Sequence, residues 1–294
     1  MSLPEQTRFD VTTSDGLTLA GFRYGVADPG LPTIVAVHGY PDNHHVWDGV
    51  AEQIAGRANL VTFDVRGAGE SDAPAGRSGY RFEQVISDIS RVIDATGADR
   101  VHLLGHDWGS IQAWHAVCDP TVAVKVASYT SISGPNLNHA GRFFRSARTP
   151  GDVAKAARQA AGSTYIPVFL IPGVAETMYR RGWGQKLIET LERRGTKGVP
   201  DGVYTRSDRD FVNGLNLYRA NMPRPFVLPE HATTTVPVQV LTPAGDLFVT
   251  PALQLAGLSA SPDSRHVTTD GGHWVVTQDP AAVAGPLLDW VGQH

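Results

Sequence analysis

Short, largely apolar runs alternate with amphipathic segments over the first 130 residues of the chain. The runs Thr33–Val37, Leu60–Phe63 and Val101–Leu104 have the composition of strands buried on both faces of a sheet. Between them, Phe82–Thr96 repeats apolar residues at three- and four-residue intervals, which is the period of an amphipathic helix. This alternation of strand and helix predicts a parallel sheet covered by helices.

The alternation begins with a hairpin and is interrupted once. Arg8–Thr13 and Leu17–Tyr24 flank the turn signal Ser14-Asp15-Gly16 and predict two antiparallel strands. Residues 134–231 contain helix-like segments but no clear strand pattern, and the alternation resumes from Val236 to Val291. We therefore expect an α/β core of residues 1–133 and 232–294, with residues 134–231 inserted as a helical cap. The other predicted elements are strands Val124–Thr130, Val236–Leu241 and Arg265–Thr268 and helices His45–Gly56, Gly151–Ala161, Val174–Arg194, Asp208–Ala220, Pro251–Leu258 and Pro280–Val291.

Composition narrows the class of protein. A net charge of −4 gives no reason to expect a nucleic acid partner, and no apolar run approaches the ~20 residues of a membrane span. The single cysteine, Cys118, excludes an internal disulfide. Together with a polar amino-terminal segment, these features predict a cytoplasmic protein without a membrane span.

Charge is unevenly distributed between the two predicted parts. Residues 134–231 hold 15 Lys and Arg but 8 Asp and Glu, a net charge of +7, which leaves −11 for the rest of the chain. Two interpretations are open. The insertion attracts acidic ligands, or it is a basic cap resting on an acidic body, which is the interpretation that we favour.

The third apolar run leads into Gly105-His106-Asp107-Trp108-Gly109 and then into a helix-like segment from Ser110 to Val117. A strand followed by a sharp turn with glycines two residues to either side is typical of the nucleophile elbow. The elbow usually carries serine, whereas this one carries Asp107. A carboxylate at this position can attack an sp³ carbon and form an alkyl ester.

Two further side chains follow predicted strands in the order expected for a catalytic triad. Asp246 follows the strand after the insertion, and His273 follows the last strand. Asp107 is expected to be ionised and needs no base to attack, so His273 would act later, as general base toward water. Asp246 would orient His273, and the backbone N–H groups of Tyr40 and Trp108 would form the oxyanion hole.

The electrophile stays open on these residues alone. A halide leaving group would need indole or amide N–H donors, whereas an epoxide oxygen would need an acid or hydroxyl to protonate it. The insertion offers Tyr165 and Tyr218 for the second role. The loop Gly67-Ala68-Gly69 lacks the third glycine of a dinucleotide fingerprint, so we expect it to be structural.

The chain resembles the epoxide hydrolases of the α/β-hydrolase fold over nearly its whole length. The resemblance lies in His38-Gly39-Tyr40-Pro41, the Asp107 elbow, Asp246, Gly272-His273-Trp274 and the insertion between the sixth and seventh strands. It implies an α/β-hydrolase fold without cofactor or metal. Tyr165, upstream of Pro172-Gly173-Val174-Ala175-Glu176, and Tyr218, in an Asn-x-Tyr-Arg context, match the two cap tyrosines that bind and protonate the epoxide oxygen in that family. The resemblance also implies a cis bond before Pro41.

From this resemblance we expect a small, apolar epoxide substrate in a pocket lined by His38, Pro41, Phe169 and Trp274. A haloalkane dehalogenase with the same Asp nucleophile and a non-catalytic binding protein on the hydrolase scaffold are the alternatives. The chain also resembles bacterial hydrolase domains fused to a short-chain dehydrogenase, so it is either a stand-alone enzyme or a domain of a larger protein. Its oligomeric state is left open.

Overall fold

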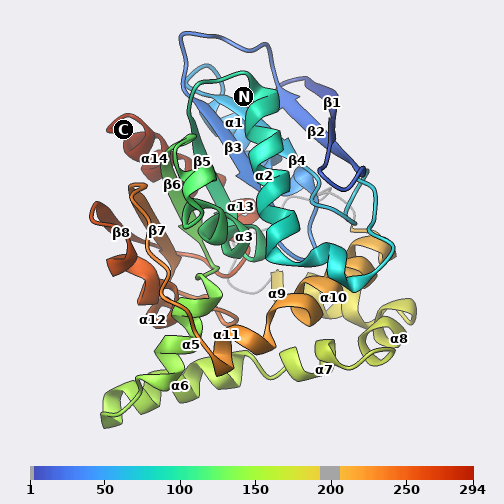
Figure 1. Ribbon diagram of the computed structural model, residues 1–294, viewed down its shortest axis with the longest axis vertical. Coiled ribbons are helices and arrows are strands. Elements are labelled where there is room, and N and C mark those ends of the chain that lie inside the picture. Colours follow the sequence, from blue (N-terminus) through green and yellow to red (C-terminus); the bar gives the residue numbers. More distant parts are fainter. Residues whose placement is uncertain (1–2, 193–205) are drawn as a thin grey trace.

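A mixed eight-stranded sheet runs through the molecule (Figure 1). The computed structural model describes residues 3–192 and 206–294. The strand order is β1-β2-β4-β3-β5-β6-β7-β8, in which β1 and β2 are antiparallel to their neighbours and the strands from β4 to β8 pair in parallel. The predicted hairpin and parallel sheet are therefore confirmed. The strands are β1 Gln6–Thr12, β2 Thr18–Tyr24, β3 Thr33–Val37, β4 Asn59–Phe63, β5 Val101–His106, β6 Val126–Ile132, β7 Val238–Pro243 and β8 Ser264–Thr269.

Helices cover both faces of this sheet, which explains why its central strands are apolar throughout. Along β3, Val35 and Val37 pack into the cluster formed with α2 (Phe82–Thr96) and α3 (Trp108–Val117). Ile34 and Ala36 point to the opposite face, as the two-residue period of a strand requires, and pack with α1 (Asp48–Ile54) and α14 (Pro280–Val291). The remaining core helices are η1 His44–Trp47, η2 Arg77–Tyr80, α4 Pro120–Ala123, α12 Pro251–Gln254, η3 Leu255–Ala260 and α13 Val275–Gln278.

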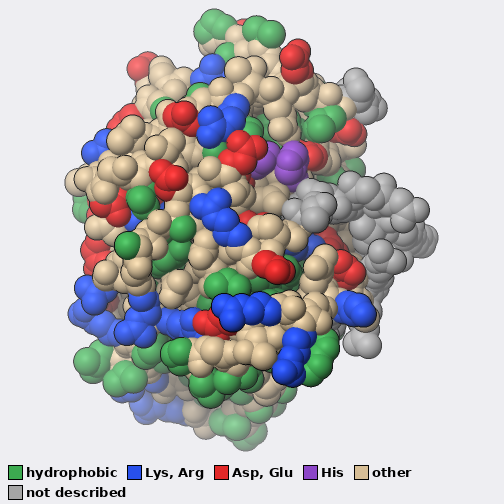
Figure 2. Space-filling model, turned by 90° about the vertical axis from the view of Figure 1, so that its right-hand side faces the viewer, with side chains coloured by type: hydrophobic (Ala, Val, Ile, Leu, Met, Phe, Trp, Pro, Cys, Tyr) green, Lys and Arg blue, Asp and Glu red, His purple; other side chains and the backbone are tan. Residues whose placement is uncertain are grey.

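The described residues between β6 and β7 form helices and no strand, and they lie across the carboxyl end of the sheet (Figure 1). On the face drawn in Figure 2, Lys and Arg side chains gather in a band over this lower part of the molecule. None of the described helices combines the length and the apolar character needed to cross a bilayer. The helices of this segment, which we call the cap from its position over the sheet, are α5 Leu137–Arg145, α6 Pro150–Gly162, α7 Ile166–Leu170, α8 Val174–Arg180, α9 Trp183–Glu192, α10 Asp208–Asn221 and α11 Pro223–Val227.

The predicted single helix from Val174 to Arg194 is wrong. The structure has two helices there, because Gly182 adopts a φ of 71°, a left-handed conformation that ends a helix. Residues 193 and 194 lie outside the described part of the chain. The predictions over α6 and α10 agree with the structure to within one residue at each end, helped by Thr149 and Ser207, whose hydroxyls accept a backbone N–H of the first turn.

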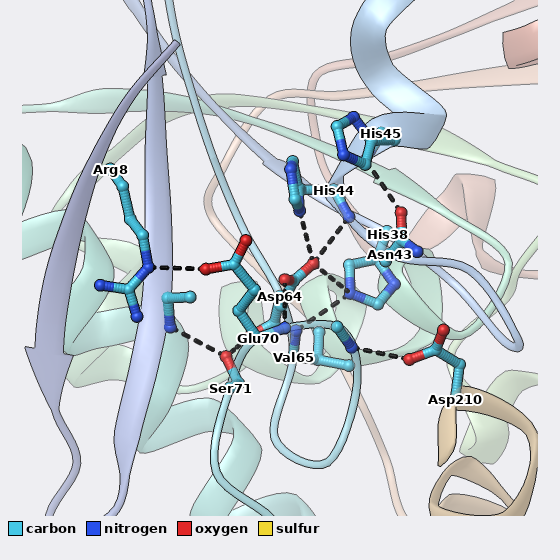
Figure 3. Close-up of polar contacts among 12 residues, drawn as sticks. Arg8, His38, Asn43, His44, His45, Asp64, Val65, Glu70, Ser71 and Asp210 are labelled. Carbon is cyan, nitrogen blue, oxygen red and sulfur yellow. Dashed lines mark hydrogen bonds and ion pairs between the residues drawn. The ribbon is translucent and has the colours of Figure 1, made fainter. Parts of the chain in front are cut away.

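The loop after β4 attaches the cap to the core (Figure 3). The carboxylate of Asp64 accepts hydrogen bonds from the backbone N–H of His44 and Glu70 and so holds the loop closed. The N–H of Gly69 then donates to Asp210 on α10 at 2.7 Å, and Arg209 donates to the Gly69 carbonyl at 2.9 Å. This loop therefore fixes the start of α10, the helix that carries Tyr218.

Candidate active site

The elbow between β5 and α3 holds Asp107 in a strained conformation. Its φ of 52° and ψ of −122° are rare for a residue with a side chain and cost energy that the surrounding structure must offset. The flanking glycines permit this turn. A Cβ at Gly109 would lie 2.0 Å from the Val37 carbonyl oxygen, and one at Gly105 would lie 2.6 Å from the Cα of Ser110. The glycine spacing seen in the sequence is therefore a steric requirement of the elbow.

The two carboxylate oxygens of Asp107 have different partners. Oδ1 accepts a hydrogen bond from the backbone N–H of Tyr40 at 2.7 Å. Oδ2 lies 3.4 Å from Nε2 of His273. Among the described hydrogen bonds, none joins the Trp108 N–H to this carboxylate, so of the two predicted oxyanion donors only Tyr40 is placed on it. The Tyr40–Pro41 bond is cis.

Asp246 and His273 meet beside this carboxylate. Nδ1 of His273 lies 3.1 and 3.2 Å from the two oxygens of Asp246. Burial lowers the pKa of His273, but the charge of Asp246 and hydrogen bonds to Asp107 and Asp246 outweigh burial and raise that pKa to about 10. Burial likewise opposes ionisation of Asp246, yet the charge of His273 keeps the pKa of that carboxyl below its usual value. The free site therefore holds a protonated imidazole between two carboxylates.

A second histidine supports the first from the elbow. Nε2 of His106 lies 2.7 Å from the backbone carbonyl oxygen of His273, and its Nδ1 lies 3.9 Å from Asp42. Asp42 in turn accepts from Arg206 Nε at 2.7 Å, and Arg206 pairs with Glu192 at 2.8 Å. Polar contacts from the cap thus reach Asp42, which lies next to the histidine that supports the His273 loop.

Tyr165 and Tyr218 approach Asp107 from the cap. Tyr165 precedes α7 and Tyr218 lies on α10, with their ring centroids 6.3 Å apart. Burial, followed by the negative charge of Asp107, raises the pKa of the Tyr165 hydroxyl. The pKa of the Tyr218 hydroxyl is raised as well, first by burial and then by the nearby Tyr165 and Asp107, and these effects outweigh the opposite effect of Trp108. Both phenols are consequently neutral near neutral pH and can donate a hydrogen bond.

Residues next to the two tyrosines hold them in place. Arg219, which follows Tyr218, pairs with Glu176 at 2.7 Å and donates to the Phe169 carbonyl at 2.9 Å. Glu176 ends the Pro-Gly-Val-Ala-Glu motif downstream of Tyr165, and Arg219 ends the Asn-x-Tyr-Arg motif around Tyr218, so the two motifs contact each other through this ion pair. The pair fixes α10 against α7 and α8, and with them the separation of the two hydroxyl groups.

Two cavities meet at this site. The smaller has a volume of about 190 Å³ and the larger about 460 Å³, and both are lined by Asp107, Tyr165, Tyr218 and Phe248. The smaller is otherwise lined mainly by apolar and aromatic side chains from the cap and core: Tyr40, Pro41, Val168, Phe169, Ala175, Met178, Tyr179, Gly184, Ile188, His273 and Trp274. Apolar residues of α3, α5, α7 and α11 contribute to the larger one, including Trp108, Ile111, Leu137, Phe144, Leu170 and Phe226, and so does Met222 between α10 and α11.

Three of the four predicted pocket residues, Pro41, Phe169 and Trp274, line the smaller cavity. His38 lines neither of the two cavities, so its prediction as a pocket residue is wrong. Its Nδ1 lies 2.8 Å from the Gly39 carbonyl oxygen and its Nε2 accepts from the N–H of Val65 at 3.0 Å (Figure 3), so it is a buried support of its own loop.

Sequence reasoning missed Phe248 and Tyr179 as pocket residues. Phe248 could have been found, because it follows Asp246 by two residues on a loop already assigned to the site. Tyr179 carried no signal that separated it from the other cap tyrosines. Among the described residues, no three His, Cys, Asp or Glu side chains are grouped so that they could hold a metal ion.

Comparison with known proteins agrees with this geometry. The family described as alpha/beta hydrolase fold matches residues 32–280. Human epoxide hydrolase 4 is 31% identical over 281 residues, which are 89% of this chain and 73% of that protein. The chain belongs to the epoxide hydrolases of the α/β-hydrolase fold. The crystal structure of epoxide hydrolase A from Mycobacterium thermoresistibile, 25% identical, covers 97% of the chain with a TM-score of 0.75.

Other epoxide hydrolases show the same fold at lower identity. The Bacillus megaterium enzyme, solved in complex with an inhibitor, is 20% identical and superposes with a TM-score of 0.78 over 97% of this chain.

The protein named probable oxidoreductase EphD from Mycobacterium tuberculosis is 32% identical over 254 residues, which are 82% of this chain but 42% of that protein. The chain therefore spans about two-fifths of the length of that relative.

Proposed function

We propose that this chain converts an apolar epoxide into a vicinal diol through an ester formed on Asp107. The observation that carries the proposal is the meeting of one carboxylate and two neutral phenols, Tyr165 and Tyr218, at the junction of two apolar cavities. A carboxylate alone would suit several electrophiles. Paired phenols suit an oxygen that becomes an alkoxide as its bond to carbon breaks.

In the proposed first step, Oδ2 of Asp107 attacks an epoxide carbon and the carbon–oxygen bond of the ring breaks. Oδ1 is held by the Tyr40 N–H at 2.7 Å and becomes the carbonyl oxygen of the ester. The departing oxygen takes a proton from one of the two phenols, and solvent returns a proton to that phenol later. The N–H of Trp108, the residue after the nucleophile, is our second oxyanion donor.

In the second step, the ester changes the state of His273. Esterification removes the charge of Asp107, one of the groups that raises the pKa of this imidazole to about 10, so His273 releases its proton to solvent more readily. The neutral imidazole takes a proton from water, and the resulting hydroxide attacks the ester carbonyl. Asp246 stabilises the imidazolium, and Tyr40 receives charge on Oδ1. The tetrahedral intermediate then collapses, the bond to the diol oxygen breaks, and that oxygen takes a proton from His273. Asp107, released as the acid, gives its proton back to His273 and is restored as the carboxylate.

The dehalogenase alternative is less well supported. A halide would need N–H donors facing the nucleophile, whereas the indole of Trp108 packs edge-on against Tyr218 at a centroid distance of 4.7 Å. The cap instead supplies the hydroxyl groups of Tyr165 and Tyr218, which suit a departing oxygen. The intact Asp107–His273–Asp246 arrangement also speaks against a non-catalytic binding protein.

A substrate panel tests the proposal. Matched epoxides and bromoalkanes of equal chain length are incubated with the protein, and diol and bromide are quantified. We expect diol from the epoxides and no bromide above the uncatalysed rate. Bromide release with no diol would replace the proposal by the dehalogenase.

We further propose that residues 134–231 act as the cap on a core of residues 1–133 and 232–294, and that the reaction needs neither cofactor nor metal. The two cavities support a substrate with two apolar arms of unequal size, one on each side of Asp107.

We also propose that the protein is cytoplasmic. Its single cysteine, Cys118, forms no disulfide, which suits a reducing compartment.

A further inference from the structure

Helix α6 of the cap buries one side chain, and that side chain is polar. Of its thirteen residues, all of which lie within the described part of the chain, only Gln159 is buried, at 1% exposed. An amide in such a place is stable only when protein groups replace its hydrogen bonds to water. The partners of Gln159 therefore show what this helix is attached to.

The Gln159 amide uses all four of its hydrogen-bonding positions, three of them on the loop that follows Asp246. Its Oε1 accepts from the backbone N–H of Thr250 at 2.8 Å and from the Thr250 hydroxyl at 2.9 Å. Its Nε2 donates to the Phe248 carbonyl oxygen at 2.8 Å and to the Ser163 hydroxyl at 2.9 Å. Helix α6 thus holds this loop from the side of the cap.

A second contact brings α6 against the same loop. A Cβ at Gly162 would lie 2.4 Å from the Leu247 carbonyl oxygen, so the helix approaches the loop more closely than a larger residue would permit. From the core side, the Asp246 carboxylate accepts the backbone N–H groups of Phe248 and Val249, each at 2.9 Å. The backbone around Phe248 is therefore held between the cap and the core.

The side chain that these contacts position is Phe248, which lies where the two cavities meet. It lines both of them, and its ring centroid lies 5.7 Å from that of Tyr165 and 5.1 Å from that of His273. Movement of this ring would change the boundary between the cavities without removing a reacting group. Fixing the backbone of Phe248 consequently fixes this boundary.

We propose that Gln159 is a specificity-determining residue that acts through Phe248. By holding the ring at the boundary, it makes each cavity accept one arm of the epoxide, the shorter arm in the smaller cavity. This inference rests on the proposed function and assigns the preference for arms of unequal length to a contact between cap and core. An apolar pocket discriminates by shape and volume, so a boundary that moves relaxes the preference.

Two isomeric epoxides test the proposal. Both are cis epoxides with the same number of carbons, and one carries an ethyl and a decyl arm whereas the other carries two hexyl arms. The measured quantity is the ratio of kcat/KM for the unequal over the equal isomer in wild type and in Gln159→Met, which keeps the side-chain length but loses the bonds to the loop. Gln239→Met is the matched control, because Gln239 is buried and hydrogen-bonded but lines neither cavity.

We expect the ratio to fall about tenfold in Gln159→Met, the effect of a change in apolar fit, and to keep its wild-type value in Gln239→Met. Any effect on Asp246 acts on both isomers alike and cancels in the ratio. Thr250→Val removes one of the three bonds to the loop and should lower the ratio about two- to threefold. This variant decides the question if Gln159→Met does not fold.

A double-mutant cycle tests whether Gln159 acts through Phe248. Phe248→Ala removes the ring and should lower the ratio as Gln159→Met does, and adding Gln159→Met to it should cause no further change. Gln159 also lines the larger cavity. A further fall in the double variant would therefore mean that residue 159 affects the substrate directly, and this would overturn the proposed route through Phe248.

An unchanged ratio in Gln159→Met and Thr250→Val, with diol still formed, would overturn the inference and leave the proposed function intact. If wild type forms diol from neither isomer, the proposed function fails, and calorimetric binding then decides the selectivity. Analogues of both isomers with a cyclopropane in place of the epoxide are titrated into wild type and Gln159→Met. A Kd ratio that favours unequal arms in wild type and is lost in the variant supports the boundary, and equal ratios in the two proteins overturn it.

Discussion

A carboxylate in place of a hydroxyl at position 107 changes what the neighbouring histidine must do. A serine needs a base before it can attack, whereas a carboxylate attacks unaided, so His273 is required only for the ester. The structure fits that division, because the free site favours the protonated imidazole and the loss of one carboxylate charge favours the neutral base. Formation of the ester on Asp107 thus favours the neutral form of His273, which is the form needed to hydrolyse that ester.

Removing the imidazole should therefore trap the intermediate. In His273→Gln, attack by Asp107 continues but water is no longer activated, and we expect diol release to slow by about 10²- to 10⁴-fold. Mass spectrometry of the protein after mixing with an epoxide should show one added substrate mass on the peptide that contains Asp107. Slow turnover without any adduct would mean that His273 serves the first step instead.

The position of His273 between two carboxylates also affects stability. Its folded pKa of about 10 lies above the usual 6.5, so its stabilising contribution is complete below pH 6.5 and is lost as pH rises toward 10. The free energy of unfolding of wild type should fall over this range by on the order of 4 kcal/mol more than that of His273→Gln. Urea unfolding at pH 6.5 and pH 10 measures this difference. Parallel pH profiles in the two proteins would contradict the proposed charge state.

At the scale of elements, the cap helices act by holding the two tyrosines at a fixed separation. Arg219 connects α10 to Glu176 on α8 and to backbone carbonyls at the end of α7. A planar guanidinium can make these contacts together, whereas a lysine ammonium cannot. The contacts of Arg219 thus hold the segment that carries Tyr165 against the helix that carries Tyr218.

Arg219→Lys should accordingly slow ester formation about tenfold, with ester hydrolysis unaffected, because the change moves the tyrosines and leaves His273 in place. Stopped-flow single turnovers separate the two steps. Arg224→Lys is the matched control, since its pair with Glu230 is exposed. Equal slowing of both steps would mean that the clamp supports the whole site and not only the tyrosines.

The sequence predicted elements well where local pattern and tertiary role agree. Strands such as β3 are buried on both faces, so their apolar runs were clear. Helix α5 was missed because it contains Gly141, where a Cβ would lie 2.1 Å from the Pro225 carbonyl oxygen, and this close approach to α11 exists only in the folded protein. The left-handed Gly182 that separates α8 from α9 is likewise invisible in the helical pattern.

Site prediction had the same limit. Asp107, Asp246 and His273 follow strands that share one edge of the sheet, so their meeting could be anticipated. His38 was placed in the pocket because its loop is there, but the direction of its ring is set by Val65. The division of the pocket into two cavities depends on how the cap packs, which no local pattern encodes.

For the whole molecule, the opposite net charges of the cap and the core produce few ion pairs between the described residues of the two parts. Among the ion pairs of described residues, one joins the cap to the core, between Arg206 and Asp42. It is buried and continues to Glu192 in the cap, whose carboxylate also accepts from Thr277 in the core. One buried network of ion pairs and a hydrogen bond thus joins the cap to the core.

Arg206→Gln should destabilise the protein by about 3 kcal/mol, because it removes the guanidinium that pairs with the buried carboxylates of Asp42 and Glu192. Arg224→Gln, which breaks an exposed pair, should cost less than about 1 kcal/mol. Urea unfolding at neutral pH compares the two variants. Similar small losses in both would show that the buried network does not hold the cap.

The covalent route through Asp107 is the central claim, and a single turnover in ¹⁸O-labelled water tests it most directly. With protein in excess over epoxide, the oxygen that reaches carbon comes from the Asp107 carboxylate, and the water oxygen enters that carboxylate when the ester is hydrolysed. We predict an unlabelled diol from the first turnover and one ¹⁸O atom in the peptide that contains Asp107. A labelled diol in that first turnover, with unlabelled Asp107, would show that water attacks the epoxide directly and would contradict the ester mechanism.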